Sequence, residues 1–268
     1  TLVAAVGIAD DRGLLHHQIK LFVGMPAAGV ILIASGVRGH LLEAIWPGPA
    51  AQAADMGLTL LWVVGITASF SIFDHMDGLC TGVAAMACVF FLIFAGASGQ
   101  VLVGTLAAAV LGAALGFLRW NFNPAKIFLG DGGAMFLGFL MATLGLKLRL
   151  AELPHVTSWM IPALILGVPI FDTTLVSISR ARRGLLPFAT PGKDHAAHRL
   201  ANLGLGQRGA VVALYALGAV FGVLALAVSR VVERAGLAIG AATLAAVLVG
   251  VALLERAPYE RQEVENRG

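Results

Sequence analysis

Six aspartates occur at the ends of long apolar segments in this 268-residue chain. They are Asp10, Asp11, Asp74, Asp77, Asp131 and Asp172. An aspartate within a membrane segment costs roughly 2.5–3.5 kcal/mol on insertion scales, so it usually marks a function. A single aspartate at a helix end could equally be a helix cap. Six aspartates at the same end of their segments instead predict one electronegative site that binds a cation.

Mg²⁺ is the cation that suits such a site, with Mn²⁺ as a substitute. Mg²⁺ takes oxygen ligands, binds one or two carboxylates together with substrate phosphates, and keeps part of its water shell. Phosphoryl transfer needs charge neutralisation and in-line positioning more than it needs a strong covalent catalyst. The carboxylate cluster therefore favours chemistry on phosphate groups.

The longest polar segment, residues 180–208, is rich in basic residues and histidines. Arginines such as Arg183 and Arg199 could hold phosphate oxygens, or they could bind anionic lipid heads. His195 and His198 are three residues apart, so on a helix they would share one face. Zinc binding, phosphate binding or proton handling, and a structural role all stay open for this pair. An H-x-x-H motif without further Cys or His ligands is only weak support for zinc.

The composition is that of a membrane protein. Hydrophobic residues make up 59% of the chain and charged residues 12%, and the mean hydropathy is +0.89. Soluble domains are about 45–50% apolar and about 25% charged. Cys80 and Cys88 lie in an apolar stretch and indicate no disulfide framework. This composition makes the lipid bilayer the expected environment. No nucleic-acid-binding motif occurs in the sequence.

The apolar runs predict an all-α, polytopic membrane protein with eight complete transmembrane helices. A spanning helix needs about 20 apolar residues. Runs of about this length fall near 21–39, 57–73, 80–97, 101–119, 133–150, 159–179, 209–229 and 236–254. Only nine residues precede Asp10, so we expect Thr1 to lie within a truncated N-terminal span. Residues 1–268 are expected to form a single domain, with a cytoplasmic loop at 180–208 and a polar tail at 255–268.

The distribution of basic residues predicts the orientation. If the spans alternate, segments 10–20, 74–79, 120–131, 180–208 and 255–268 share one side. These segments and the adjoining Arg119 carry thirteen of the eighteen Lys and Arg residues. Cytoplasmic loops carry an excess of Lys and Arg. The side that holds the six aspartates is therefore predicted to face the cytoplasm.

Five segments, in order along the chain, resemble the polyprenyl-phosphate N-acetylhexosamine-1-phosphate transferases of glycosyl transferase family 4. They are GIADDRGLLHHQIK (7–20), FDHMDGLCTGVAA (73–85), NFNPAKIFLGDGGAMFLGF (121–139), PIFDTT (169–174) and KDHAAHRL (193–200). This family includes relatives that start surface glycans, and it is related to the phospho-N-acetylmuramoyl-pentapeptide transferase of peptidoglycan synthesis. One such motif would be weak support, whereas five in the same order are specific.

The resemblance implies a reaction and a location. It implies a Mg²⁺-dependent phosphoglycosyl transferase that moves N-acetylglucosamine-1-phosphate, or a related sugar phosphate, from a UDP-sugar to undecaprenyl phosphate and releases UMP. This would be the first membrane step of cell-envelope glycan synthesis. The location implied is the bacterial inner membrane, with the active site on the cytoplasmic face, and the family resemblance allows a homodimer.

The resemblance also implies roles for particular residues. By position in the motifs, Asp10, Asp11 and Asp131 would be catalytic, and Asp131, Asp11 and Asp77 would hold Mg²⁺. The residues expected to contact the substrates are Lys20, Asp74, Asp77, Asn121, Lys126, Asp172, Arg183, His195, His198 and Arg199.

Several positions depart from the family pattern. Ser71 stands where the family usually has Asn, and His75 replaces a small or amide residue; Ala68, Ala134 and Ala197 also differ. A catalytically inactive relative that acts as a binding or scaffold protein is therefore one alternative. A CDP-alcohol phosphatidyltransferase is another, because D-H-M-D-G resembles the start of that signature, although Thr81-Gly82 then replaces its Ala-Arg.

Overall fold

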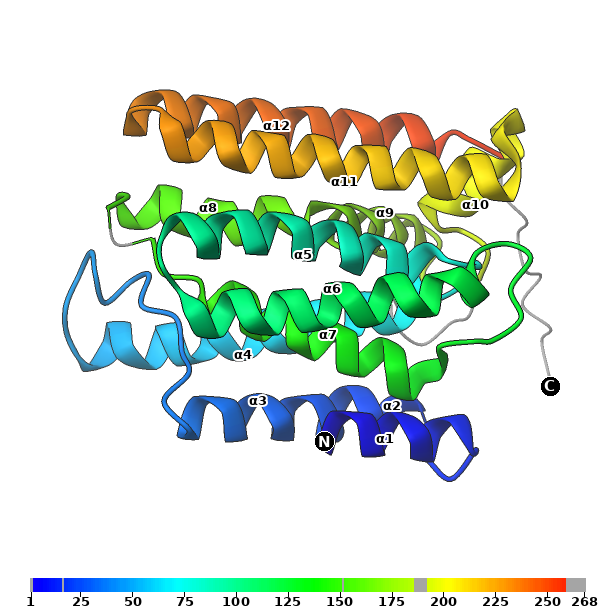
Figure 1. Ribbon diagram of the computed structural model, residues 1–268, viewed down its shortest axis with the longest axis horizontal. Helices are drawn as coiled ribbons and strands as arrows, with labels where there is room; N and C mark the ends of the chain where they lie inside the picture. The colour runs from blue at the N-terminus through cyan, green and yellow to red at the C-terminus, as the bar shows by residue number, and fades with distance from the viewer. Residues whose placement is uncertain (1, 16, 151, 186–191, 259–268) are drawn as a thin grey trace.

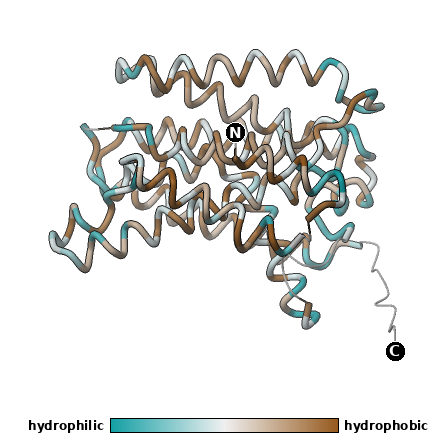
Figure 2. Tube along the Cα trace, turned by 90° about the horizontal axis from the view of Figure 1, so that it is seen from below, coloured by the Kyte–Doolittle hydropathy of each residue, from teal (hydrophilic) through white to brown (hydrophobic). Residues whose placement is uncertain are grey.

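The computed structural model describes residues 2–15, 17–150, 152–185 and 192–258, and within these residues its regular structure is entirely helical (Figure 1). The all-α prediction is confirmed. Figure 1 shows the long helices lying roughly side by side, with α1 and α3 along one edge of the bundle and α11 and α12 along the opposite edge. In Figure 2 the hydrophilic residues gather toward the two ends of the bundle, while the middle is largely hydrophobic.

The helices follow one another in a simple order. They are α1 (Leu2–Asp11), α2 (His17–Ile19), the π-helix η1 (Lys20–Gly24), α3 (Met25–Ala34), α4 (Pro49–Phe73), α5 (Leu79–Ala97), α6 (Val101–Asn121), α7 (Gly130–Lys147), α8 (His155–Ile165), α9 (Gly167–Arg182), α10 (Ala196–Leu200), the π-helix η2 (Ala201–Leu205), α11 (Gly206–Arg230) and α12 (Glu233–Glu255).

Within the described residues, five helical segments are long and apolar enough to cross a membrane: α4, α5, α6, the continuous segment Ala196–Arg230, and α12. The number rises to six if α8 and α9 together form one span. The chain is therefore a multi-pass membrane protein, but the predicted eight spans plus a truncated one are not confirmed. The 18 residues of α7 include both Asp131 and Lys147, which lower its hydropathy. The apolar segment Lys20–Ala34 is shorter than a usual span.

The predicted span at 159–179 is broken rather than straight. Helices α8 and α9 meet at an angle of 77°. Pro162 lies inside α8 and Pro169 in the first turns of α9. Proline has no backbone N–H and clashes with the preceding turn, so a proline on each side of Leu166 explains why the helix bends there.

Two close backbone contacts hold α7 against α1 and α4. A Cβ atom on Gly7 would lie 2.5 Å from the Cα of Gly132, and one on Gly138 would lie 2.9 Å from the Cα of Thr67. Only glycine permits such approaches, which are common where membrane helices pack. The contact between Gly7 and Gly132 brings the C-terminal end of α1 beside the N-terminal end of α7, where the aspartates lie.

Candidate active site

A cluster of polar side chains lies where α1, η1, α4 and α7 meet; we call Asp10, Asp11, Lys20, Ser71 and Asp131 the aspartate centre. The Lys20 ammonium donates to Asp10 Oδ2 at 2.7 Å and to Asp131 Oδ2 at 2.5 Å. The Ser71 hydroxyl donates to the other Asp131 oxygen at 2.6 Å. Residues separated by up to 121 positions thus converge, as the sequence predicted for Asp10, Asp11 and Asp131.

Asp11 caps helix α7. Its carboxylate oxygens accept hydrogen bonds from the backbone N–H of Asp131 at 2.8 Å and from that of Gly132 at 3.0 Å. The first N–H groups of a helix lack partners within the helix, and the helix dipole favours negative charge there. This carboxylate therefore fixes the end of α7, and with it Asp131, against α1.

The charges of the aspartate centre influence the pKa of Asp74. This residue directly follows α4 in the turn to α5. Burial, and next the negative charges of Asp131 and Asp11, raise the pKa of Asp74 to about 7. Such an unfavourable accumulation of carboxylates is expected at a site that binds a cation.

Asp77 and Asn121 join the turn after α4 to the loop after α6. Asp77 Oδ2 accepts hydrogen bonds from Asn123 Nδ2 and from the backbone N–H of Ala125, both at 3.0 Å. The buried Asn121 side chain accepts from the N–H of Gly78 at 3.0 Å and donates to the carbonyl of Ile127 at 2.9 Å. Both residues were predicted to contact ligands, and the structure gives each of them contacts that support the loops.

Lys126 lies in the same loop. Its ammonium is 5.3 Å from the centre of the Trp120 ring, a cation–π distance. Its backbone N–H donates to the carbonyl of Trp120 at 2.8 Å. Lys126 was predicted to contact a phosphate group, and in this structure its ammonium lies over the Trp120 ring.

A second cluster, the histidine cluster, contains His75, Asp172, His195 and His198. Asp172 is fully buried in α9, and its two oxygens accept from His195 Nδ1 and from the N–H of Ala196, both at 2.7 Å. The His75 ring centre is 4.0 Å from that of His195 and 4.7 Å from that of His198. Burial, and next the neighbouring His195, hold the pKa of His75 well below its usual range. The His75 ring is therefore uncharged.

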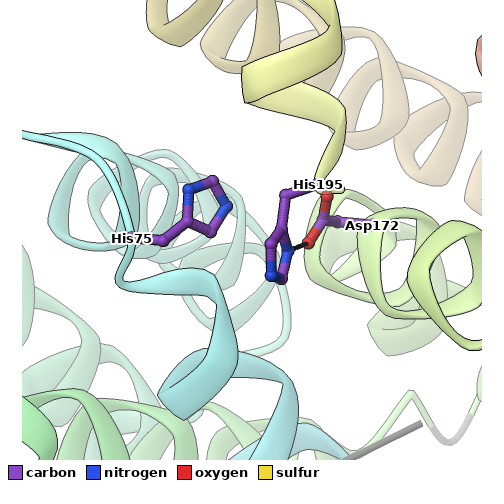
Figure 3. A group of neighbouring side chains, drawn as sticks. All are labelled: His75, Asp172 and His195. Atoms are coloured by element: carbon purple, nitrogen blue, oxygen red, sulfur yellow. Dashed lines mark hydrogen bonds and ion pairs between the residues drawn. The ribbon is translucent and has the colours of Figure 1, made fainter. Parts of the chain in front are cut away.

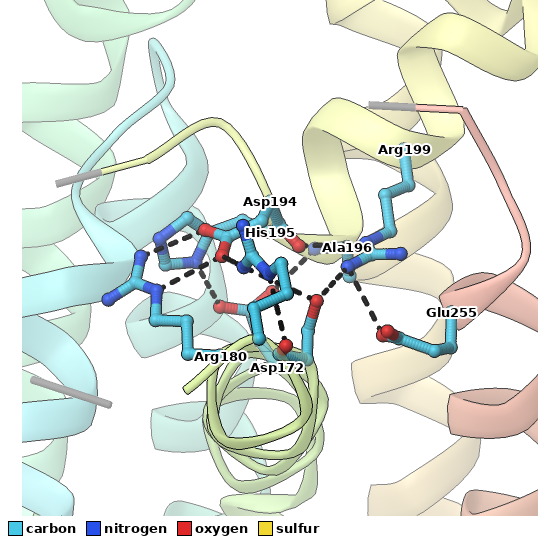
Figure 4. A network of polar contacts seen from close by, with 9 residues as sticks. Asp172, Arg180, Asp194, His195, Ala196, Arg199 and Glu255 are labelled. Atoms are coloured by element: carbon cyan, nitrogen blue, oxygen red, sulfur yellow. Dashed lines mark hydrogen bonds and ion pairs between the residues drawn. The ribbon is translucent and has the colours of Figure 1, made fainter. Parts of the chain in front are cut away.

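A third group, the arginine network, anchors the histidine-containing loop (Figure 4). It comprises Arg180, Arg183, Asp194, Arg199 and Glu255. Asp194 accepts from Arg180 Nε at 3.0 Å and from Arg180 Nη2 at 2.8 Å, and it also accepts from Arg183. Burial would raise the pKa of Asp194, but the hydrogen bonds and charge of Arg180 outweigh it and set the pKa to about 2.

Arg199 is fully buried in this network. Its guanidinium donates to the carbonyls of Asp194 and Leu254, at 2.8 and 2.7 Å, and to Ser179 Oγ at 2.8 Å. It also pairs with Glu255 at 3.3 Å. Arg183 and Arg199 were predicted to bind substrate, whereas the structure gives both of them partners within the protein.

The sequence alone did not identify three of the polar residues. Ser71 had been noted only as a departure from the family pattern, although its hydroxyl binds Asp131. Asp194 and Arg180 form a buried ion pair across 14 residues that no local motif signals. The sequence did offer one clue to Asp194, because this residue directly precedes His195 and lies four residues before His198.

An apolar cavity of about 590 Å³ lies between α4, α8 and α9. Leu58, Leu61, Trp62, Ile66 and Trp159 line it. It extends to Ser69 and Thr173, which are near Ser71 and Asp172 in the chain. A cavity of this character can hold a hydrocarbon chain beside the polar end of the bundle.

The comparisons with known proteins identify the family of this chain. The family model for glycosyl transferase family 4 matches residues 1–149, more than half of the chain. A probable undecaprenyl-phosphate N-acetylglucosaminyl 1-phosphate transferase of Bacillus subtilis is 35% identical over 227 residues, which are 84% of this chain. The matched chain spans 63% of that relative's length.

Two further relatives match this chain over a larger share of their own length. A decaprenyl-phosphate N-acetylglucosaminephosphotransferase of Mycolicibacterium smegmatis is 30% identical over 98% of this chain and 70% of the relative. A phospho-N-acetylmuramoyl-pentapeptide-transferase of Anoxybacillus flavithermus is 30% identical over 82% of this chain and 69% of the relative. The segments that resembled this family in the sequence include those that build the aspartate centre, and the chain belongs to glycosyl transferase family 4.

Proposed function

We propose that this chain carries the transferase domain of an enzyme that moves N-acetylglucosamine-1-phosphate from a UDP-sugar to undecaprenyl phosphate and releases UMP. The names of the relatives in Bacillus and Mycolicibacterium support the substrates. The structural observation that carries the proposal is Lys20, which bridges Asp10 and Asp131. This arrangement concentrates carboxylates around one cation, as a phosphate-transfer site that uses Mg²⁺ requires.

Carboxylate oxygens are the ligands that Mg²⁺ prefers in proteins. We propose Asp131, Asp11 and Asp77 as its ligands, with Mn²⁺ as a substitute. When bound, the ion would neutralise the diphosphate of the sugar nucleotide and template the attack. Asp11 and Asp77 each accept two hydrogen bonds in this structure, and a carboxylate can accept about four, so lone pairs remain for a metal ion.

The remaining side chains would handle the two phosphate groups. Lys20 is held between two carboxylates, so it is preorganised to contact a phosphate that replaces one of them. Asp10 would orient the lipid phosphate or accept its proton. His195, oriented by Asp172, would contact the sugar nucleotide. The other proposed substrate contacts are Asp74, Asn121, Lys126 and His198. Arg183 and Arg199 would act indirectly, by holding the loop that carries the histidines.

The membrane arrangement follows from the same proposal. The apolar cavity beside α4 and α9 would receive part of the polyprenyl chain. We propose that α8 and α9 together form a sixth span and that α7 and the segment Lys20–Ala34 also cross the inner membrane, which gives the predicted eight crossings. The excess of Lys and Arg at the end of the bundle that carries the aspartates supports a cytoplasmic active site.

The test is UMP release from UDP-N-acetylglucosamine by the full-length protein in detergent, with undecaprenyl phosphate and Mg²⁺. We expect release that depends on both the lipid and the metal and that disappears in Asp131→Asn. Glu152→Gln changes an exposed carboxylate near the other end of α7 and serves as the matched control. Absence of UMP from every UDP-N-acetylhexosamine, in a folded protein, would overturn the proposal and favour an inactive, ligand-binding relative.

A further inference from the structure

Three side chains from distant parts of the sequence meet at the histidine cluster (Figure 3). His75 comes from the turn between α4 and α5, Asp172 from α9, and His195 from the residue that precedes α10. One potential ligand atom from each of these side chains lies within 4.8 Å of the other two. The sequence offered only the weak H-x-x-H pair, whereas the fold adds a third imidazole and a carboxylate.

His75 is the unusual member of this group. Both of its ring nitrogens are inaccessible to solvent and have no hydrogen-bond partner among the described residues. Buried polar groups nearly always have a partner, so an imidazole with two unsatisfied nitrogens indicates a missing ligand. In Figure 3 the His75 ring lies beside that of His195, and the two ring centres are 4.0 Å apart.

His195 has the hydrogen bond that orients a metal ligand. Its Nδ1 contacts Asp172 Oδ2 at 2.7 Å, in a pair that is almost completely buried. Histidines that bind metals usually donate their other ring N–H to a carboxylate, which fixes the tautomer and makes the ligand nitrogen more basic. Asp172 can therefore serve either as this orienting group or as a ligand itself.

We propose that His75, His195 and Asp172 bind a divalent transition-metal ion of the zinc class, at a site separate from the carboxylate oxygens of the aspartate centre. Two imidazole nitrogens with a carboxylate suit zinc or its close neighbours, whereas Mg²⁺ prefers oxygen ligands. Ligand atoms around one zinc ion, each about 2.0–2.2 Å from it, are at most about 4.4 Å apart. Small side-chain rotations would bring the three groups into that range.

Such an ion would link three elements that are well separated in the sequence. His75 follows directly after Asp74, and His195 lies between α10 and Asp194, which the arginine network holds. A metal ion here would fix the turn after α4 against α9 and α10. This inference does not depend on the proposed transferase reaction.

The test is binding of Co²⁺, a spectroscopic substitute for Zn²⁺, to the full-length protein in detergent that contains excess Mg²⁺. Excess Mg²⁺ occupies oxygen sites and leaves the nitrogen site to be measured. We expect one equivalent of Co²⁺, with visible ligand-field bands that Zn²⁺ abolishes. His75→Ala should lower the Co²⁺ affinity by more than about 100-fold, because the loss of even an orienting partner costs about 10–100-fold.

Two variants serve as controls. His155→Ala removes an exposed histidine of α8 and should leave Co²⁺ binding unchanged. Asp131→Asn should also retain Co²⁺ even if it abolishes UMP release, which separates the two proposals. The proposal is overturned if the wild-type protein binds no Co²⁺ in excess Mg²⁺, or if His75→Ala binds as tightly as the wild type. If His75→Ala does not fold, His75→Gln takes its place, and Co²⁺ binding as tight as that of the wild type would overturn the proposal. A wild-type Co²⁺ spectrum with bands typical of six oxygen ligands would also overturn it.

Discussion

The aspartate centre and the arginine network lie at the same end of the bundle, yet they are built in opposite ways. In the aspartate centre, Asp10 and Asp131 share one lysine, and the side chains of Asp131 and Lys20 remain 24% and 17% exposed. In the arginine network, Arg199 is 0% exposed, and the three arginines pair with Asp194 and Glu255 among the described residues. The first region carries an excess of negative charge, whereas the second is built on buried ion pairs such as Arg180–Asp194. We infer that the aspartate centre binds ligands and that the arginine network holds the loop in place.

The strongest test of this comparison is Arg199→Met. Its guanidinium has four partners among the described residues, so its removal leaves buried carbonyls and Glu255 without this donor. Breaking a buried ion pair in this way costs about 3–5 kcal/mol. We expect a marked fall in the thermal midpoint of the detergent-solubilised protein. Arg182→Met, at an exposed position of α9, should melt like the wild type. Equal midpoints for the two variants would contradict a structural role for the arginine network.

Lys20→Met tests the other half of the comparison. This variant leaves Asp10 and Asp131 without their shared cation. We expect kcat for UMP release to fall by about 10²–10³, the usual effect of losing one preorganised electrostatic contact, while the thermal midpoint changes little. Lys147→Met, at the far end of α7, is the matched control. If Lys20→Met melts far below the wild type but keeps its kcat, the aspartate centre is structural.

The sequence predicted that all six aspartates would form one site, whereas the structure brings Asp10, Asp11 and Asp131 into direct contact with shared partners and gives Asp77 and Asp172 others. Asp10, Asp11 and Asp131 converge because α1 and α7 touch through Gly7 and Gly132, and this contact depends on tertiary packing. Asp77 instead binds Asn123 and Ala125, and Asp172 binds His195. Local motifs cannot reveal which partner each carboxylate finds.

The number of spans was the weakest part of the sequence prediction. Hydropathy treats 159–179 as one continuous run, whereas α8 and α9 bend by 77° between Pro162 and Pro169. Hydropathy is also insensitive to whether a segment such as α7 faces lipid or other helices. The helical class was predictable because no apolar run alternates with period two, while the path of each helix depends on its neighbours.

The pKa values sharpen the comparison further. Asp194 in the arginine network has a pKa of about 2, whereas that of Asp74 near the aspartate centre is about 7. An unfolded aspartate titrates near a pKa of about 3.9. Between about pH 4 and pH 7, folded Asp74 therefore holds a proton that the unfolded chain has released. The contribution of Asp74 to the free energy of unfolding falls as the pH rises through this window and is constant above it.

Asp74→Asn should remove this pH dependence. Measured without Mg²⁺, the thermal midpoint of the variant relative to the wild type should rise between pH 4 and pH 8. The gain corresponds to on the order of 2 kcal/mol, after allowance for water that reaches a partly exposed group. A difference between Asp74→Asn and the wild type that does not change with pH would contradict the raised pKa of Asp74.

Ser71→Ala should have the smallest effect and is the finest test of the aspartate centre. The Ser71 hydroxyl donates to Asp131 Oδ1 at 2.6 Å, whereas that of Ser69, two residues earlier, donates to the carbonyl of Gly65 in its own helix. Losing one hydrogen bond to a partly exposed carboxylate costs about 1 kcal/mol, so we expect a loss of roughly fivefold in kcat/KM. Ser69→Ala should retain full activity, and Ser71→Asn should recover most of it because an amide can also donate to Asp131. Equal activities of the two alanine variants would mean that the orientation of Asp131 depends on Lys20 and the α7 backbone rather than on Ser71.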